Sequence, residues 1–209
     1  MKRRYALWLF FVLGVSFLST LPETAGAAPA GTVVALSGQC FVEGQGRRSA
    51  LKVGDTVNVS DTVVVPAGGK ARLQMSDGSV ISVASGSRMT VADYKVDASG
   101  QRQSAALSLT EGLLRAVVAP VSQPSVFEVS TAVGTAAVRS TDWFIEIQQG
   151  AAQVGVLTGS VALTSNATNR SVVIPARWGA RLEAGRDPVQ ARVWAPNEFE
   201  AVIARTDVR

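Results

Sequence analysis

The sequence predicts an all-β protein of many short strands, built either as two packed sheets or as an irregular β-roll or solenoid-like barrel, with a short C-terminal helix. Three observations predict this class. Short runs of Val, Leu, Ile and Thr are broken by Gly, Pro and Asp-Gly about every 8–12 residues, the spacing expected of sandwiches and barrels. Several runs alternate apolar and polar side chains. Residues 31–193 show almost no helical periodicity.

The clearest element is a hairpin formed by strands at 70–76 and 79–84. In the first strand every second residue is apolar, so one face is expected to be buried. Asp77-Gly78 joins the two runs. Asp-Gly between strand runs is a strong hairpin signal, and both turn residues are expected to take positive φ.

The same criteria predict the other strands and one helix. In chain order the strands are expected at 32–36, 39–43, 62–65, 88–96, 104–109, 113–119, 125–130, 135–139, 142–148, 151–157, 160–165, 171–174 and 177–183. The helix is expected near 197–205, because Phe199, Val202 and Ile203 recur at the spacing of one helical face.

Composition excludes several functional classes. Apolar residues make up 47% of the chain and charged residues 17%, which is not the composition of a disordered protein. The chain has no histidine, so the usual Ser-His-Asp and Cys-His nucleophiles and most zinc sites are excluded. A single cysteine excludes a disulfide framework within the chain. No catalytic, metal-binding or cofactor-binding residue, and no cofactor, is therefore expected.

The N-terminus has the three parts of a secretory signal peptide over residues 1–27. Lys2-Arg3-Arg4 precede an apolar stretch, and Ala25-Gly26-Ala27 supply small residues for cleavage. An uncleaved membrane anchor is the alternative. The remainder, 28–209, is expected to form a single domain. It has 17 basic and 15 acidic residues, too even a balance to predict nucleic-acid binding.

Several motifs in the exported part occur in a fixed order. They are Leu51-Lys52-Val53-Gly54-Asp55, then Asp77-Gly78-Ser79, then Phe127-Glu128-Val129-Ser130-Thr131, and finally Val138-Arg139-Ser140-Thr141-Asp142-Trp143-Phe144. Together they resemble the FecR domain family over about residues 33–165. The resemblance implies structural or binding roles for Gly54, Asp55, Asp77, Gly78, Arg139 and Thr141. Ser140 stands where the family pattern has Gly.

The best-known members of this family are inner-membrane sigma regulators with a cytoplasmic anti-sigma segment, a membrane span and this domain outside. Here only about four residues precede the apolar stretch. The resemblance therefore implies a stand-alone, non-catalytic binding, sensing or scaffold module of the cell envelope, located in the periplasm. The expected partner is an envelope protein or a surface or cell-wall polysaccharide, with membrane contact only if the signal is uncleaved.

Two alternative functions remain open from the sequence. One is an envelope carbohydrate-active enzyme that uses a carboxylate pair, with Asp142 and Glu146 as candidates. The other is a signal-anchored regulator of a transmembrane signalling system, facing the periplasm from the inner membrane. Arg139 likewise has two interpretations: a structural clasp that ties neighbouring strands, or a ligand contact. Alternation places Arg139 on the same strand face as Ala137.

Overall fold

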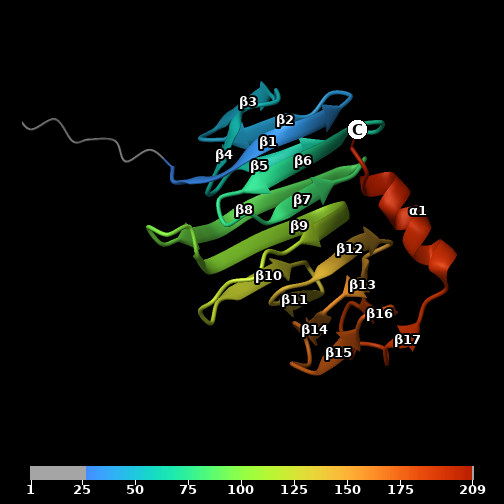
Figure 1. Cartoon of the computed structure of the whole chain (residues 1–209). Helices are drawn as coiled ribbons and strands as arrows, with labels where there is room; N and C mark the ends of the chain where they lie inside the picture. Colours follow the sequence, from blue (N-terminus) through green and yellow to red (C-terminus); the bar gives the residue numbers. More distant parts are fainter. Residues whose placement is uncertain (1–26, 209) are drawn as a thin grey trace, which may run out of the picture.

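The computed structural model describes residues 27–208, so the predicted signal peptide lies outside the described residues except for Ala27. Seventeen strands and one helix make up the described part (Figure 1). The strands are β1 (Pro29–Ser37), β2 (Phe41–Gly44), β3 (Arg47–Ala50), β4 (Thr56–Asn58), β5 (Thr62–Val65), β6 (Lys70–Met75), β7 (Val80–Val83), β8 (Ser87–Val96), β9 (Arg102–Val117), β10 (Val126–Ser130), β11 (Gly134–Val138), β12 (Asp142–Gln148), β13 (Ala151–Thr158), β14 (Ser160–Ser165), β15 (Ser171–Pro175), β16 (Trp178–Glu183) and β17 (Arg192–Val193). The helix is α1 (Pro196–Thr206).

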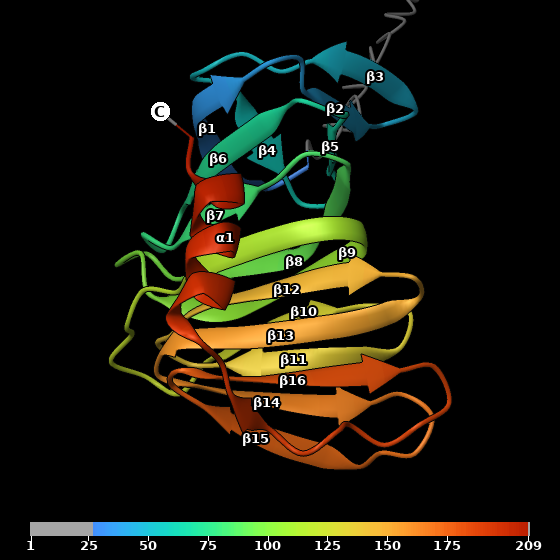
Figure 2. The ribbon, with the colours of Figure 1, turned by 90° about the vertical axis from the view of Figure 1, so that its right-hand side faces the viewer.

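The strands form two layers that face each other, which confirms the all-β prediction (Figure 2). In sheet A the order is β4-β1-β6-β7-β9-β12-β13-β16-β17. In sheet B it is β3-β2-β5-β8-β9-β10-β11-β14-β15. All pairs are antiparallel except β9 with β10. The strands stack along the long axis of the molecule, from β1 to β15 (Figure 2).

Strand β9 belongs to both layers and makes the hydrogen bonding continuous. Its first part, up to Glu111, pairs with β8 in sheet B, and the part from Gly112 onward pairs with β12 in sheet A. Gly112 has a φ of +83°, and a Cβ there would lie 2.6 Å from the Gly86 carbonyl oxygen. Glycine is therefore required at the point where the strand changes layers. The two strands predicted at 104–109 and 113–119 are halves of this single element.

Alternation decides which side chains form the core. Leu73, Ile81 and Ile145 point inward from sheet A, and they pack in one cluster with Leu107 and Phe127 from sheet B. Each of these five side chains is fully buried. The intervening residues point outward and form the two outer faces of the sandwich.

Helix α1 covers the outer face of sheet A and confirms the helix predicted near 197–205. Phe199 and Val202 pack with Leu113, Phe144 and Trp194 in a second apolar cluster on that face. Figure 2 shows the helix lying in front of the strands of this sheet. Within residues 27–208, none of the helical structure has the length and hydropathy of a membrane-crossing segment.

The hairpin predicted at 70–84 is present as β6 and β7, but the expected turn geometry is wrong at Asp77. Gly78 alone has positive φ, +87°. Its N–H donates to the Met75 carbonyl at 3.0 Å, and the Met75 N–H donates to the Ser79 carbonyl at 2.8 Å. This is a turn with one left-handed residue rather than two. The Asp77 carboxylate points inward and has no exposed surface.

Three short strands escaped prediction: β3, β4 and β17. They have two to four residues each, and β3 is exposed along its whole length. Such strands lack the buried alternation on which the prediction depends. They form only because longer neighbours offer them backbone hydrogen bonds.

Candidate functional site

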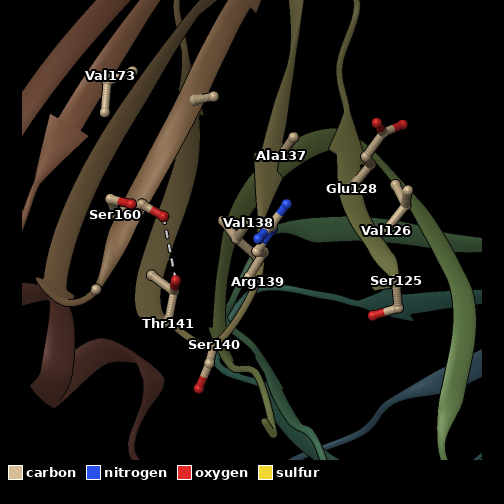
Figure 3. Close-up of a pocket in the computed structure, with 12 residues that line it drawn as sticks. Ser125, Val126, Glu128, Ala137, Val138, Arg139, Ser140, Thr141, Ser160 and Val173 are labelled. Atoms are coloured by element: carbon tan, nitrogen blue, oxygen red, sulfur yellow. Dashed lines mark hydrogen bonds between the residues drawn. The ribbon is translucent and has the colours of Figure 1, made fainter. Parts of the chain in front are cut away.

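The outer face of sheet B carries a groove. Helix α1 lies on sheet A, and no described helix covers the opposite face. The groove has a volume of about 470 Å³ and is formed by β10, β11, β14 and β15 with their connecting loops. Its lining comprises Ser125, Val126, Glu128, Ala137, Val138, Arg139, Ser140, Thr141, Gly159, Ser160, Ala162 and Val173 (Figure 3).

Small side chains create the hollow. Ala137 lies beside Glu128 on one neighbouring strand and beside Ala162 on the other, and Ala162 in turn lies beside Val173. Cross-strand neighbours on one face have Cβ atoms about 5 Å apart, so two alanines in succession leave room for a ligand. Val126 and Val173, both more than half exposed, border the alanine floor.

Arg139 supplies a cation at one end of this groove. It lines the groove together with Ala137. Across residues 27–208 its guanidinium has neither an ion pair nor a side-chain hydrogen bond, and the same is true of the Glu128 carboxylate. A groove that holds an unpaired cation and an unpaired anion can accept and donate hydrogen bonds to a polar ligand.

Thr141 fixes the rim of the groove beside Arg139. Its hydroxyl donates to the Ser160 carbonyl at 3.2 Å, which ties the segment before β12 to the start of β14 (Figure 3). The Thr141 side chain is buried. The structure brings two signature residues together here. The Thr141 side chain makes a structural hydrogen bond, whereas the Arg139 guanidinium has no partner within residues 27–208.

Asp77 lies at the centre of a buried polar network. Its carboxylate pairs with Arg102, and both side chains have no exposed surface. It also accepts hydrogen bonds from the Ser79 N–H at 2.9 Å and from the Tyr94 hydroxyl at 2.6 Å. The Arg102 guanidinium donates to the carbonyls of Ala119, at 3.3 Å, and Arg139, at 3.4 Å. Asp77 and Gly78 are thus connected to the groove through Arg102.

This network contains residues that the motif analysis missed. The sequence gives no signal for the burial of Arg102, because an isolated arginine between polar residues is expected to be exposed. Burial, followed by the hydrogen bond to Asp77, raises the pKa of Tyr94. The neutral phenol is therefore the stable form in the folded protein.

Gly54 and Asp55 lie apart from the groove. Gly54, with a φ of +94°, donates its N–H to the Val33 carbonyl at 2.8 Å. The Asp55 carboxylate accepts the Lys52 N–H at 2.8 Å and so closes its own turn. The turn contacts β1 near the end of the sandwich opposite to β15 (Figure 1). These two signature residues shape a turn and have no shared surface with Arg139.

Asp142 and Glu146 do not have the geometry of a carboxylate pair for glycoside hydrolysis. They are four residues apart on β12, about 13 Å along an extended strand. Asp142 accepts two hydrogen bonds from Arg115, at 2.9 and 2.8 Å, and Glu146 pairs with Arg205 of α1. The hydrogen bonds to Asp142 raise the pKa of Arg115. Both carboxylates are occupied by arginines on the face of sheet A.

Within the part of the chain that the structure describes, no group of three or more Cys, Asp or Glu side chains could hold a metal ion.

Comparisons with known proteins show which family and which solved structures this chain is similar to. Residues 61–162 match the family model described as FecR protein. Two crystal structures of a candidate anti-sigma factor from Parabacteroides distasonis ATCC 8503 share the fold, with TM-scores of 0.56 and 0.55 at 15% sequence identity. The two matches cover 67% of this chain and 63% and 62% of the Parabacteroides chains, which is less than two thirds of their length. No curated protein matches the chain. The matched segment includes the Asp77-Gly78 turn, the hydrogen-bonded Thr141 and the exposed Arg139, and residues 61–162 are therefore similar to a FecR domain.

Proposed function

We propose that this protein is an exported, non-catalytic sensing module of the cell envelope, which binds its ligand from the periplasm in the groove at Arg139. The observation that carries this proposal is the guanidinium of Arg139, which lines the groove and has no ion pair or side-chain hydrogen bond within residues 27–208. In that region the structural contact is made by Arg102, whose guanidinium donates a hydrogen bond to the Arg139 backbone carbonyl. The side chain of Arg139 is left for an external partner.

The surroundings of Arg139 support binding rather than chemistry. The groove offers one cation, one carboxylate and several hydroxyls over an alanine floor. It contains no second carboxylate for acid–base catalysis and, since the chain has no histidine, no imidazole base. A β-scaffold that presents such a surface is typical of recognition modules.

The test compares capture of envelope components by two single variants. The exported chain, residues 28–209, is immobilised and incubated with an envelope extract. Arg139→Ala is expected to reduce capture about tenfold, because a charge-assisted hydrogen bond to the ligand is lost. Arg47→Ala is the matched control: Arg47 is exposed on β3, at the far edge of sheet B, and has no ion pair among the described residues.

Thermal melting of the same variants separates binding from stability. Both midpoints are expected to match that of the native chain. Equal capture by the Arg139→Ala variant, or a capture loss that accompanies a lower melting midpoint, would contradict the proposal.

A further inference from the structure

A row of hydroxyl side chains crosses the outer face of sheet B beside the groove. Each member lies directly opposite the next on neighbouring strands. The row is Thr62, Thr90, Ser108, Ser130, Thr135, Thr164 and Ser171, one residue each from β5, β8, β9, β10, β11, β14 and β15. With neighbouring strands about 4.8 Å apart, the row spans about 29 Å.

The row is a surface feature and not part of the core. The residues on either side of each hydroxyl along the strands, such as Leu107 and Leu109 around Ser108, point inward and are buried. Six of the seven hydroxyl residues are half-buried, and Ser171 is exposed. Seven hydroxyls therefore face outward in register, which occurs only because of how the strands pair.

Part of the row is already hydrogen-bonded and part is free. Thr62 and Thr90 share a hydrogen bond of 2.8 Å, as do Thr164 and Ser171. Ser130 donates to the Leu107 carbonyl at 3.2 Å. In the middle of the row, the hydroxyls of Ser108 and Thr135 have no partner within residues 27–208. The free groups lie on both sides of Ser130, on β9 and on β11, and β11 also lines the groove.

The neighbouring row carries mostly small side chains. Ala106, Ala137 and Ala162 occupy its positions on β9, β11 and β14, with Glu128 between them on β10. The hydroxyl row itself has no charged member and no aromatic ring. Such a face does not match nucleic acid, which requires clustered basic residues. It also does not match an added peptide strand, which binds the edge of a sheet rather than its face.

We propose that this row binds an extended, neutral polysaccharide that lies across the strands. The inference rests on the proposed function, because the polysaccharide is the ligand whose chain continues into the groove at Arg139. Hydroxyls both donate and accept hydrogen bonds, so a regular row of them complements a polymer with hydroxyls on every unit. The alanine row leaves space for sugar rings against the sheet, and Glu128 and Arg139 accept and donate hydrogen bonds at the groove.

Affinity electrophoresis tests the inference with hydroxyethylcellulose, a soluble, extended, β-linked glucan, in the native gel. The exported chain is expected to migrate more slowly in this gel than in a gel without polymer. In the Ser108→Ala/Thr135→Val variant the apparent affinity is expected to fall at least tenfold, since two free hydroxyls are lost. The matched control is Thr32→Val/Thr56→Val, which removes two exposed, cross-paired hydroxyls from sheet A.

Each outcome decides the inference. The inference is supported if the sheet B variant loses the retardation, the sheet A control keeps it, and the melting midpoints of the two variants are equal. The inference is overturned if the polymer does not change the migration of the native chain, or if the sheet B variant is retarded as much as the native chain. If that variant melts early, Thr135→Val alone is used, because valine keeps the branched shape of threonine. A different result would be that the glucan does not retard the protein while an envelope protein is captured in an Arg139-dependent way. That result overturns the inference that the ligand is a polysaccharide, but it agrees with the proposed function.

Discussion

Arg102 and Arg139 meet where the Arg102 guanidinium donates to the backbone carbonyl of Arg139, yet their side chains have opposite surroundings. Arg102 is 1% exposed, pairs with Asp77 and lies over the Phe127 ring at 5.3 Å. Arg139 is exposed at the groove. The structural clasp that the sequence suggested for Arg139 is present in this region, but Arg102 makes it.

The first prediction at this scale concerns the stability of the two arginine variants. Arg102→Ala leaves the Asp77 charge buried without its partner, so we expect the free energy of unfolding to fall by about 3–5 kcal/mol. Arg139→Ala is the control and is expected to change it by less than about 0.5 kcal/mol. Urea denaturation of both variants measures this. Similar losses in the two variants would show that Arg139 also has a structural role.

The second prediction concerns alkaline pH. The pKa of Tyr94 is raised by burial and by its hydrogen bond to Asp77. A group whose folded pKa is raised stabilises the protein fully below its unfolded pKa, about 10 for tyrosine, and loses this contribution as the pH rises through the folded value. We therefore expect the free energy of unfolding to decline above about pH 10, and to decline less in Tyr94→Phe.

Phenolate absorbance measures this directly. Tyr94 is the only tyrosine in a chain that begins at Ala28, because the other one is Tyr5. The folded chain should show no phenolate signal near its ordinary pKa, and the signal should appear together with unfolding. Ordinary titration of Tyr94 while circular dichroism still reports the native fold would contradict the prediction.

At the scale of elements, the Trp194 side chain helps to dock the C-terminal segment on sheet A. Gly179 and Gly155 lie opposite each other on β16 and β13. A Cβ on Gly179 would lie 2.5 Å from Cζ2 of Trp194, and one on Gly155 would lie 3.2 Å from its Cζ3. The two glycines therefore form a slot for the indole, which in turn packs against Phe144 at 5.5 Å between ring centroids.

Filling this slot should loosen helix α1. In Gly179→Ala the new methyl group displaces Trp194, and we expect a loss of about 1–3 kcal/mol, typical of overpacking. The backbone at Gly179 is not left-handed, so the effect is steric. Trypsin digestion and tryptophan fluorescence measure this. Compared with the native chain, Gly179→Ala is expected to be cleaved faster at Arg192 and to show a changed fluorescence. Val193→Ala trims an exposed neighbour of Trp194 and should leave both unchanged.

At the scale of the whole molecule, the two outer faces are used differently. Sheet A is covered by α1 and forms ion pairs with this part of the chain: Glu146 pairs with Arg205 of α1, and Arg72 pairs with Asp207 just after the helix. Sheet B has no such cover among the described elements, and it presents the groove and the hydroxyl row. The family match ends at residue 162, before α1 begins, so the covering helix lies outside the matched segment.

The local sequence was sufficient for the elements whose signals are local. Alternation in 70–76, the Asp77-Gly78 turn and the apolar spacing of Phe199 and Val202 predicted the hairpin and the helix, because side-chain period follows directly from backbone geometry. The ordered motifs likewise indicated the FecR domain.

The candidate site depended on contacts between distant segments. Thr62 and Ser171 join one hydroxyl row only through the register of seven strands, and register is a property of pairing, not of any single run. The inward turn of Asp77 is decided by Arg102, 25 residues later, since a buried carboxylate requires a paired charge. Strand period predicts which face a residue occupies, whereas long-range packing sets whether that face is covered by a helix or left open to a ligand.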